Sequence, residues 1–143
     1  MMHHALLPVE NDVDRMESVV ACAVPILEAL DTSVTLYHVF SENRYSTLLD
    51  GMEVGSLDPD TLAKRNETVQ EVATRLRDHG VSADIHGSVG DPAAEIASYV
   101  ESSDVDHVFL GGRRRSSTHK ALFGSVSQQT LMSVDVRCTI AIE

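Results

Sequence analysis

Cysteine, lysine and long apolar runs are all scarce in this chain of 143 residues. Its two cysteines, Cys22 and Cys138, are too few for a disulfide framework, which indicates a reducing compartment. No apolar run approaches the ~18 residues that a membrane helix needs. The opening residues, MMHHALLPVE, lack the basic region and the cleavage site of a secretory signal. These absences predict a cytoplasmic protein with no membrane segment.

Positive charge is the second shortage. The chain has 22 Asp and Glu against 11 Lys and Arg, and only Lys64 and Lys120 are lysines, so its net charge is −11. A field of this sign repels nucleic acids and anionic membranes, and neither is expected as a partner. An acidic, lysine-poor surface suits a salt-rich cytoplasm, because salt screens the repulsion between like charges. A halophilic source is therefore one interpretation, and the ordinary acidity of many proteins is the other.

Strands and helices alternate along a chain that has no repeat, no low-complexity tract and no Pro/Gly-rich linker. With 43% hydrophobic residues, the length suits one domain, residues 1–143, that buries its own core. Apolar and β-branched runs predict strands at 4–9, 33–40, 81–89, 105–110 and 137–142. The last of these predicted strands runs from Arg137 to Ile142.

Helical spacing of apolar residues fills the intervals between these strands. The first predicted helix runs through Met16 to Leu30, and the last covers 125–133. Asp-Pro pairs predict helix starts at 58–59 and 91–92, with Gly80 ending the former helix. Residues 41–57, which are polar and contain two glycines, predict a mobile loop.

Alternating strands and helices predict an α/β fold, a five-stranded parallel sheet with helices on both faces and right-handed connections. Ligands of such sheets bind beyond the carboxyl ends of the strands. The segments at those ends are 10–12, the residues from Phe40 onward, and 111–117. A functional site is expected there.

The richest of these segments is 110–131, LGGRRRSSTHKALFGSVSQQTL. It leaves a strand at Gly111, passes Arg113, Arg114 and Arg115, and enters a helix at Gly124 and Ser125. The start of a helix offers free backbone N–H groups and a partial positive charge, both of which favour phosphate. Arginines can pair with phosphate oxygens. A plain turn, a solvated loop and a helix cap explain the same residues without a ligand.

Histidine and cysteine give no metal or catalytic pattern. The pair His3-His4 is interpreted as an N-terminal arm, and Cys22 and Cys138 as core thiols. No catalytic residues and no metal ligands are predicted. The segment after the first strand, Glu10-Asn11-Asp12, is acidic and argues against a flavin-phosphate loop, and no nucleophile elbow of a hydrolase is present.

Several motifs in order resemble the universal stress protein family. Gly111, Gly124, Ser125 and Val126 fit its signature G-x2-G-x9-G-S/T, in which Arg114 replaces the second glycine. Tyr37-His38-Val39 resembles the family's L-H-V, and GDPAAEI at 90–96 resembles its helix entry. Residues 5–9 and 136–142 resemble its first and last strands.

This resemblance implies a Rossmann-like fold of the adenine nucleotide alpha hydrolase type, with strand order 3-2-1-4-5. It also implies a small stress-response protein that binds ATP or AMP, with magnesium possible alongside the nucleotide. In binders of this family an acidic residue after the first strand contacts the nucleoside, and Glu10, following Pro8 and Val9, holds that position. The adenine is expected near the backbone of Val39, and the phosphates on the amides of Gly124, Ser125 and Val126.

Arg114 leaves two functions open. Its side chain either blocks the phosphate approach or swings out and clamps the phosphate. The first case gives the alternative function, a dimeric signalling module of the same fold that binds no nucleotide. A homodimer through the strand from Arg137 to Ile142 is expected in either case. Any ATP hydrolysis is expected to be very slow, because no general base and no Walker lysine are found.

Overall fold

The computed structural model describes residues 2–114, 121–122 and 124–142. Five parallel strands form its sheet: β1 (His4–Pro8), β2 (Ser33–Phe40), β3 (Ala83–Val89), β4 (His107–Arg114) and β6 (Arg137–Ile142). Their order across the sheet is β3-β2-β1-β4-β6, so the predicted order 3-2-1-4-5 and the parallel α/β fold are confirmed. A short strand β5 (Ala121–Leu122), which the sequence did not predict, pairs antiparallel with the end of β4.

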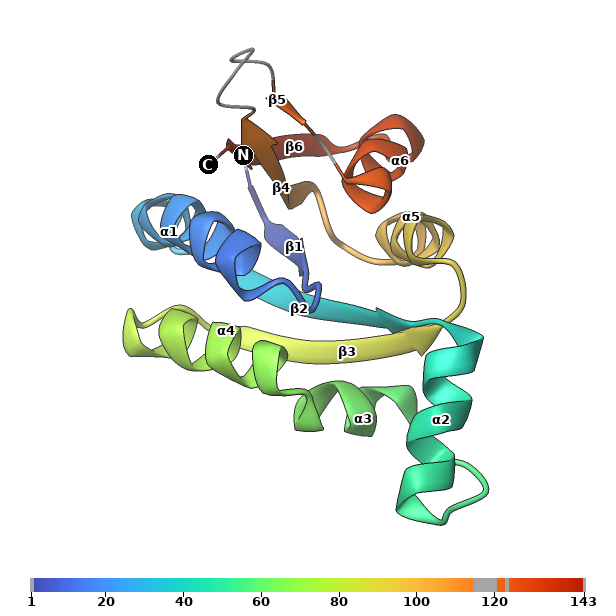
Figure 1. Ribbon diagram of the computed structural model, residues 1–143. Helices are drawn as coiled ribbons and strands as arrows, with labels where there is room; N and C mark the ends of the chain where they lie inside the picture. Colours follow the sequence, from blue (N-terminus) through green and yellow to red (C-terminus); the bar gives the residue numbers. More distant parts are fainter. Residues whose placement is uncertain (1, 115–120, 123, 143) are drawn as a thin grey trace.

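Helices cover both faces of this sheet (Figure 1). The helices are α1 (Val13–Leu30), α2 (Glu42–Met52), α3 (Pro59–Arg65), α4 (Glu67–Asp78), α5 (Pro92–Ser102) and α6 (Ser125–Ser133). Helices α1, α3 and α4 lie on one side of the sheet, and α5 and α6 lie on the other. None of the helices among the described residues is long and apolar enough to cross a membrane.

Side-chain alternation along the strands divides the core in two. Ala5 and Leu7 of β1 point to the cluster that packs against α1 and α4. Leu6, between them, joins the cluster that packs against α5, which Ile96 anchors. Both clusters are well buried, with Leu6, Leu7 and Ala5 fully inaccessible to solvent. A two-sided core explains why β1 reads as a continuous apolar run rather than an alternating one.

Two local predictions between residues 41 and 80 were wrong. Residues 41–57 are not a loop throughout, because α2 occupies Glu42–Met52, with Ser41 accepting the Arg44 N–H as its N-cap. The single helix predicted up to Gly80 is two helices. Asn66 separates them, since its extended backbone ends α3 while its side chain accepts the Val69 N–H and begins α4.

The fourth strand is longer than predicted. It continues past Leu110 to Arg114, because Gly111 and Gly112 pair with Ala141 and Ile142 of β6 instead of turning. The start of α6 at Ser125 agrees with the prediction, and so does the end of the α4 region at Gly80, whose φ of 76° is left-handed.

Candidate functional site at the strand ends

A pocket of about 290 Å³ lies where β1 and β2 end. It is lined by five of the predicted binding residues, Pro8, Val9, Glu10, Val39 and Val126. They come from β1, from the turn before α1, from β2 and from α6, so the fold joins segments that are far apart in the sequence. The volume is close to the lower end of the ~300–1,000 Å³ typical of small-molecule sites.

Tyr37 forms part of the pocket wall. Its ring stacks on Tyr99 of α5, with 4.8 Å between the centroids, and its hydroxyl donates to Ser88 Oγ on β3 at 2.9 Å. Burial raises the pKa of the Tyr37 phenol above its ordinary value. The ring is therefore a fixed, neutral surface, and Ile96 of α5 adds an apolar neighbour.

His38 connects the two strands that frame the pocket. Its Nδ1 lies 2.7 Å from the Val9 carbonyl oxygen, and its ring meets Phe40 edge-on. A carbonyl only accepts, so Nδ1 must carry the proton. Burial lowers the pKa of His38, which keeps the ring neutral at neutral pH, although the hydrogen bond to Val9 acts in the opposite direction.

Arg15 forms an ion pair with Glu10 and was not predicted to be part of the site. Its Nη1 donates to Glu10 Oε2 at 3.1 Å, and its Nε is 4.0 Å from Asp12 Oδ2. The Arg15 side chain is only 14% exposed. Asp12 also holds the start of α1, because its carboxylate accepts the backbone N–H of Arg15.

Gly111 and Gly124, the two signature glycines, both border the Arg15 side chain. A Cβ on Gly111 would lie 2.6 Å from Arg15 Cγ, and a Cβ on Gly124 would lie 2.9 Å from its Nη1. Glycine at these two positions therefore leaves the room that Arg15 occupies. No local sequence pattern could have found this contact, because the three residues meet only in the folded sheet.

Arg44 is a cation that lines the pocket itself, and sequence reasoning missed it too. It lies in the first turn of α2, in the segment predicted to be a loop. A signal for that helix was present, because Tyr45, Leu48, Leu49 and Met52 recur at helical spacing.

The remaining predicted site residues fall on β4 and α6. The backbones of Arg113 and Arg114 pair with Leu122 and Ala121, whereas Arg115 lies outside the described residues, as do the side chains of all three arginines. Ser125 is exposed at the start of α6, and its neighbour Gly124 provides no side-chain hydrogen bond as N-cap.

The histidines at the opposite end of the strands are engaged in the fold. The interpretation of His4 as part of an arm was wrong, because it lies in β1 and its two ring nitrogens contact Ser33 Oγ and Thr35 Oγ1 at 2.7 and 2.6 Å. His86 contacts Asp60 Oδ2 at 3.3 Å. In the described part of the chain, no three His, Cys, Asp or Glu residues are placed to hold a metal ion.

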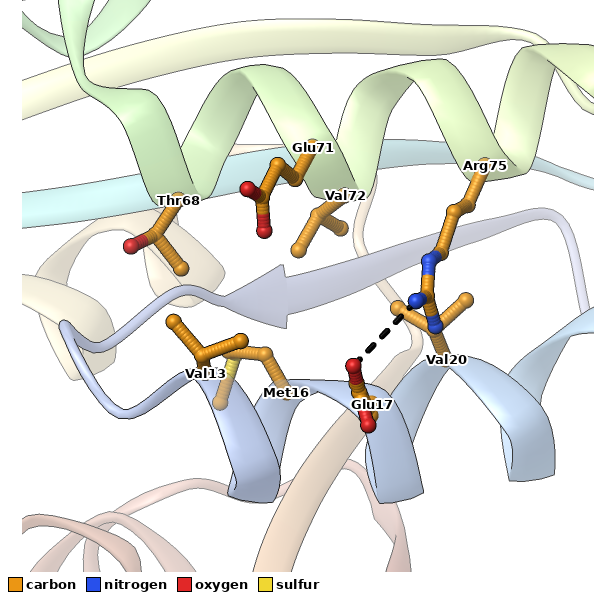
Figure 2. A pocket seen from close by; sticks show the side chains of 8 residues that line it. All are labelled: Val13, Met16, Glu17, Val20, Thr68, Glu71, Val72 and Arg75. Atoms are coloured by element: carbon orange, nitrogen blue, oxygen red, sulfur yellow. Dashed lines mark hydrogen bonds and ion pairs between the residues drawn. The ribbon is translucent and has the colours of Figure 1, made fainter.

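Another crevice lies between α1 and α4 but is too small for a ligand (Figure 2). It encloses only about 10 Å³, and the ion pair between Arg75 and Glu17, 3.2 Å apart, bridges the two helices beside it. Val13, Met16, Val20 and Val72 make it an apolar packing seam. The strand-end pocket is therefore the better candidate for a site.

The sheet order and the pocket beyond the carboxyl ends of the strands define a doubly wound α/β domain. The sequence profile of the universal stress protein family matches residues 1–141, and the chain belongs to that family.

Known proteins agree with this assignment. A universal stress protein of Mycolicibacterium smegmatis (strain ATCC 700084 / mc(2)155) is 34% identical over 74 residues, which are 51% of this chain and 57% of that relative. The match thus spans little more than half the length of the relative. The solved universal stress protein of Archaeoglobus fulgidus has a TM-score of 0.73 at 21% identity and covers 98% of both chains. A structure from the same organism in complex with dAMP has a TM-score of 0.69 at 18% identity, again covering 98% of each.

Proposed function

We propose that this protein is a small cytoplasmic stress-response regulator that binds an adenine nucleotide, ATP or AMP, in the strand-end pocket. The observation that carries the proposal is the convergence of Pro8, Val9, Glu10, Val39 and Val126 on one pocket. These are the positions at which the family resemblance expects the nucleoside and its first phosphate. A relative of the same fold was solved with dAMP, which supports a nucleotide of this class.

The chemistry of the pocket suits a nucleoside. Pro8, Val39 and Val126 supply apolar surface for a purine ring, which is itself flat and largely apolar. Glu10, whose side chain is 29% exposed, provides carboxylate oxygens that can accept from ribose hydroxyls. The adenine edge can then be read by the backbone of Val39.

The start of α6 suits the phosphates. Gly124 places no side chain and no side-chain hydrogen bond over the first N–H groups of the helix, which have no partner within the helix itself. Magnesium would enter together with the phosphates of ATP, whose oxygens are ligands that it prefers.

Calorimetric titration of the purified protein with ATP and AMP, in high salt, tests the proposal. Gly124→Val should abolish binding, because a branched side chain fills the approach to α6. Gly55→Val is the matched control, because no atom lies within 4 Å of a Cβ at Gly55, and it should bind as the wild type does. Lack of wild-type binding at millimolar nucleotide would contradict the proposal, and unchanged affinity in Gly124→Val would place the ligand elsewhere.

A second candidate is a signalling module that binds no nucleotide and dimerises through Arg137–Ile142. It is favoured by the edge position of β6, which among the described strands pairs with β4 alone, and by the 40% exposure of Ile142. Arg114→Gly separates the two candidates. Gain of ATP binding in that variant only would support the second.

A further inference from the structure

Two positive groups meet at the start of α6. Nη1 and Nη2 of Arg15 lie 2.9 and 3.7 Å from the position that a Cβ on Gly124 would take. The N-terminus of a helix carries about half a positive charge, and here no side chain caps it. The carboxylates of Glu10 and Asp12 lie 3.1 and 4.0 Å from Arg15 and offset its charge, but no side chain caps the start of α6. The free N–H groups of α6 and the guanidinium beside them together favour an anion at this point.

The hydrogen bonds of the Arg15 guanidinium are far from complete. It has five N–H donors, and among the described residues its side chain makes one hydrogen bond, from Nη1 to Glu10. Nε is buried without a hydrogen-bond partner in that part of the chain, and Asp12 Oδ2, at 4.0 Å, is too far to accept one. A guanidinium that is 14% exposed and whose buried Nε has no partner among the described residues is suited to a ligand that brings several acceptor oxygens.

We infer that Arg15 is the residue of this protein that binds the ligand's phosphate, so that the pocket selects phosphorylated nucleosides over free nucleosides. The inference rests on the proposed function and names the part of the ligand that is read. The guanidinium donates to phosphate oxygens while the first N–H groups of α6 donate to the same group. Its ion pair with Glu10 offsets the negative charge that would otherwise repel the phosphate.

A purely structural role for Arg15 makes a different prediction. If the guanidinium only positioned Glu10, its loss would weaken the binding of every ligand that Glu10 contacts, with or without phosphate. If it binds phosphate, the loss falls on phosphorylated ligands alone. Adenosine and AMP, which differ only by the phosphate, distinguish the two roles.

The test compares Arg15→Gln with Arg75→Gln. Both substitutions remove an arginine that pairs with a glutamate, at 3.1 Å for Arg15 and 3.2 Å for Arg75. Arg75, however, bridges α4 and α1 (Figure 2) and does not line the strand-end pocket. Affinities for AMP and adenosine are measured by calorimetry at one salt concentration. Circular dichroism checks that both variants are folded.

Arg15→Gln should raise the dissociation constant for AMP about 10- to 100-fold, the range expected for a lost charge-assisted hydrogen bond. The dissociation constant for adenosine should stay within about twofold of the wild-type value. Arg75→Gln should change neither. Equal weakening of AMP and adenosine, or unchanged AMP affinity, in Arg15→Gln overturns the inference but leaves the proposed function standing. Absence of wild-type binding to adenosine, AMP and ATP overturns both.

The wild-type protein gives a test that needs no variant. It should bind AMP at least about tenfold more tightly than adenosine. Equal affinities would show that the phosphate is not recognised and would overturn the inference even if Arg15→Gln failed to fold.

Discussion

The backbone N–H of Gly87 on β3 donates to Oδ1 of Asp60 on α3, with 2.8 Å between the two atoms. β3 is the outermost strand on its side of the sheet, so this bond satisfies a backbone donor that no strand can reach. Close approach of α3 makes the bond possible. A Cβ on Gly87 would fall against the Pro59 carbonyl oxygen, 2.9 Å from the Pro59 carbonyl carbon and 3.0 Å from the Ala63 Cβ.

Gly87→Ala should therefore lower the free energy of unfolding by about 1–3 kcal/mol, because backbone atoms of α3 would have to move. Gly51→Ala is the control. It meets no atom within 4 Å, and alanine favours the helix, so stability should stay equal or rise. Urea unfolding measures both. Equal stability of Gly87→Ala and wild type would contradict the close approach of α3.

Gly111 and Arg15 should be energetically coupled. A Cβ on Gly111 would lie 2.6 Å from Arg15 Cγ and 3.0 Å from a Val19 methyl. Gly111→Ala is expected to lower the free energy of unfolding by about 1–3 kcal/mol in the wild type. The loss should be smaller when Arg15 is already alanine, because the contact with Arg15 Cγ is then gone. A double-mutant cycle by urea unfolding measures this coupling. Additive costs would mean that Arg15 does not pack on Gly111.

Sequence pattern predicted the sheet well because its strands are apolar on both faces or rich in β-branched residues. The sequence pattern failed where a helix-capping residue divides a longer stretch of helical spacing. Asn66 lies within an otherwise helical stretch, and only the capping bond from the Val69 N–H to its side chain identifies the break. In α2, Gly51 and several polar residues obscured the apolar spacing, so Arg44 was not considered for the site.

The pocket residues next to the motifs were predictable, whereas Arg15 was not. Val39 lies near the end of the predicted strand 33–40, Glu10 directly follows the predicted strand 4–9, and a parallel sheet brings such ends together. Arg15 belongs to the first turn of α1, and its side chain meets Gly111 and Gly124 only after the chain has closed its sheet. Side-chain contacts between segments far apart in sequence have no local pattern.

His38 should make stability depend on pH. Burial holds the pKa of folded His38 below its ordinary value of about 6.5. As pH falls below about 6.5, the unfolded chain takes up a proton that the folded chain refuses, so the free energy of unfolding falls. His107, whose pKa burial also lowers, adds to the same slope.

His38→Asn removes the titrating ring and keeps a donor for the Val9 carbonyl. Its free energy of unfolding, measured in urea from pH 7.5 down to pH 5, should fall less steeply than that of the wild type. His79→Asn is the control, because the His79 side chain is 56% exposed, and it should keep the wild-type slope. Identical slopes for all three proteins would contradict the burial of a neutral His38.

The proposed dimer should depend on the exposed edge at β6. Ile142 is 40% exposed there, and Ile142→Lys would bury an unpaired ammonium between two copies. The dimer dissociation constant is expected to rise at least about tenfold. Leu30→Lys, at a residue 52% exposed on α1, should leave it unchanged. Light scattering at tens of micromolar protein measures both, and a monomeric wild type would end the dimer proposal.

Because of its net charge of −11, the folded protein should be more stable at high than at low salt concentration. With a charge of −11, the folded chain repels itself more than the expanded unfolded chain does. Raising KCl from about 0.1 to 1 M shortens the screening length from about 10 to 3 Å, so the free energy of unfolding in urea should rise. A variant with Asp78→Asn, Glu101→Gln and Asp104→Asn removes three exposed carboxylates and should gain less from the same KCl. Equal stability of the wild type at both salt concentrations would mean that charge repulsion does not limit the stability of this acidic protein. The halophilic interpretation would then lack physical support.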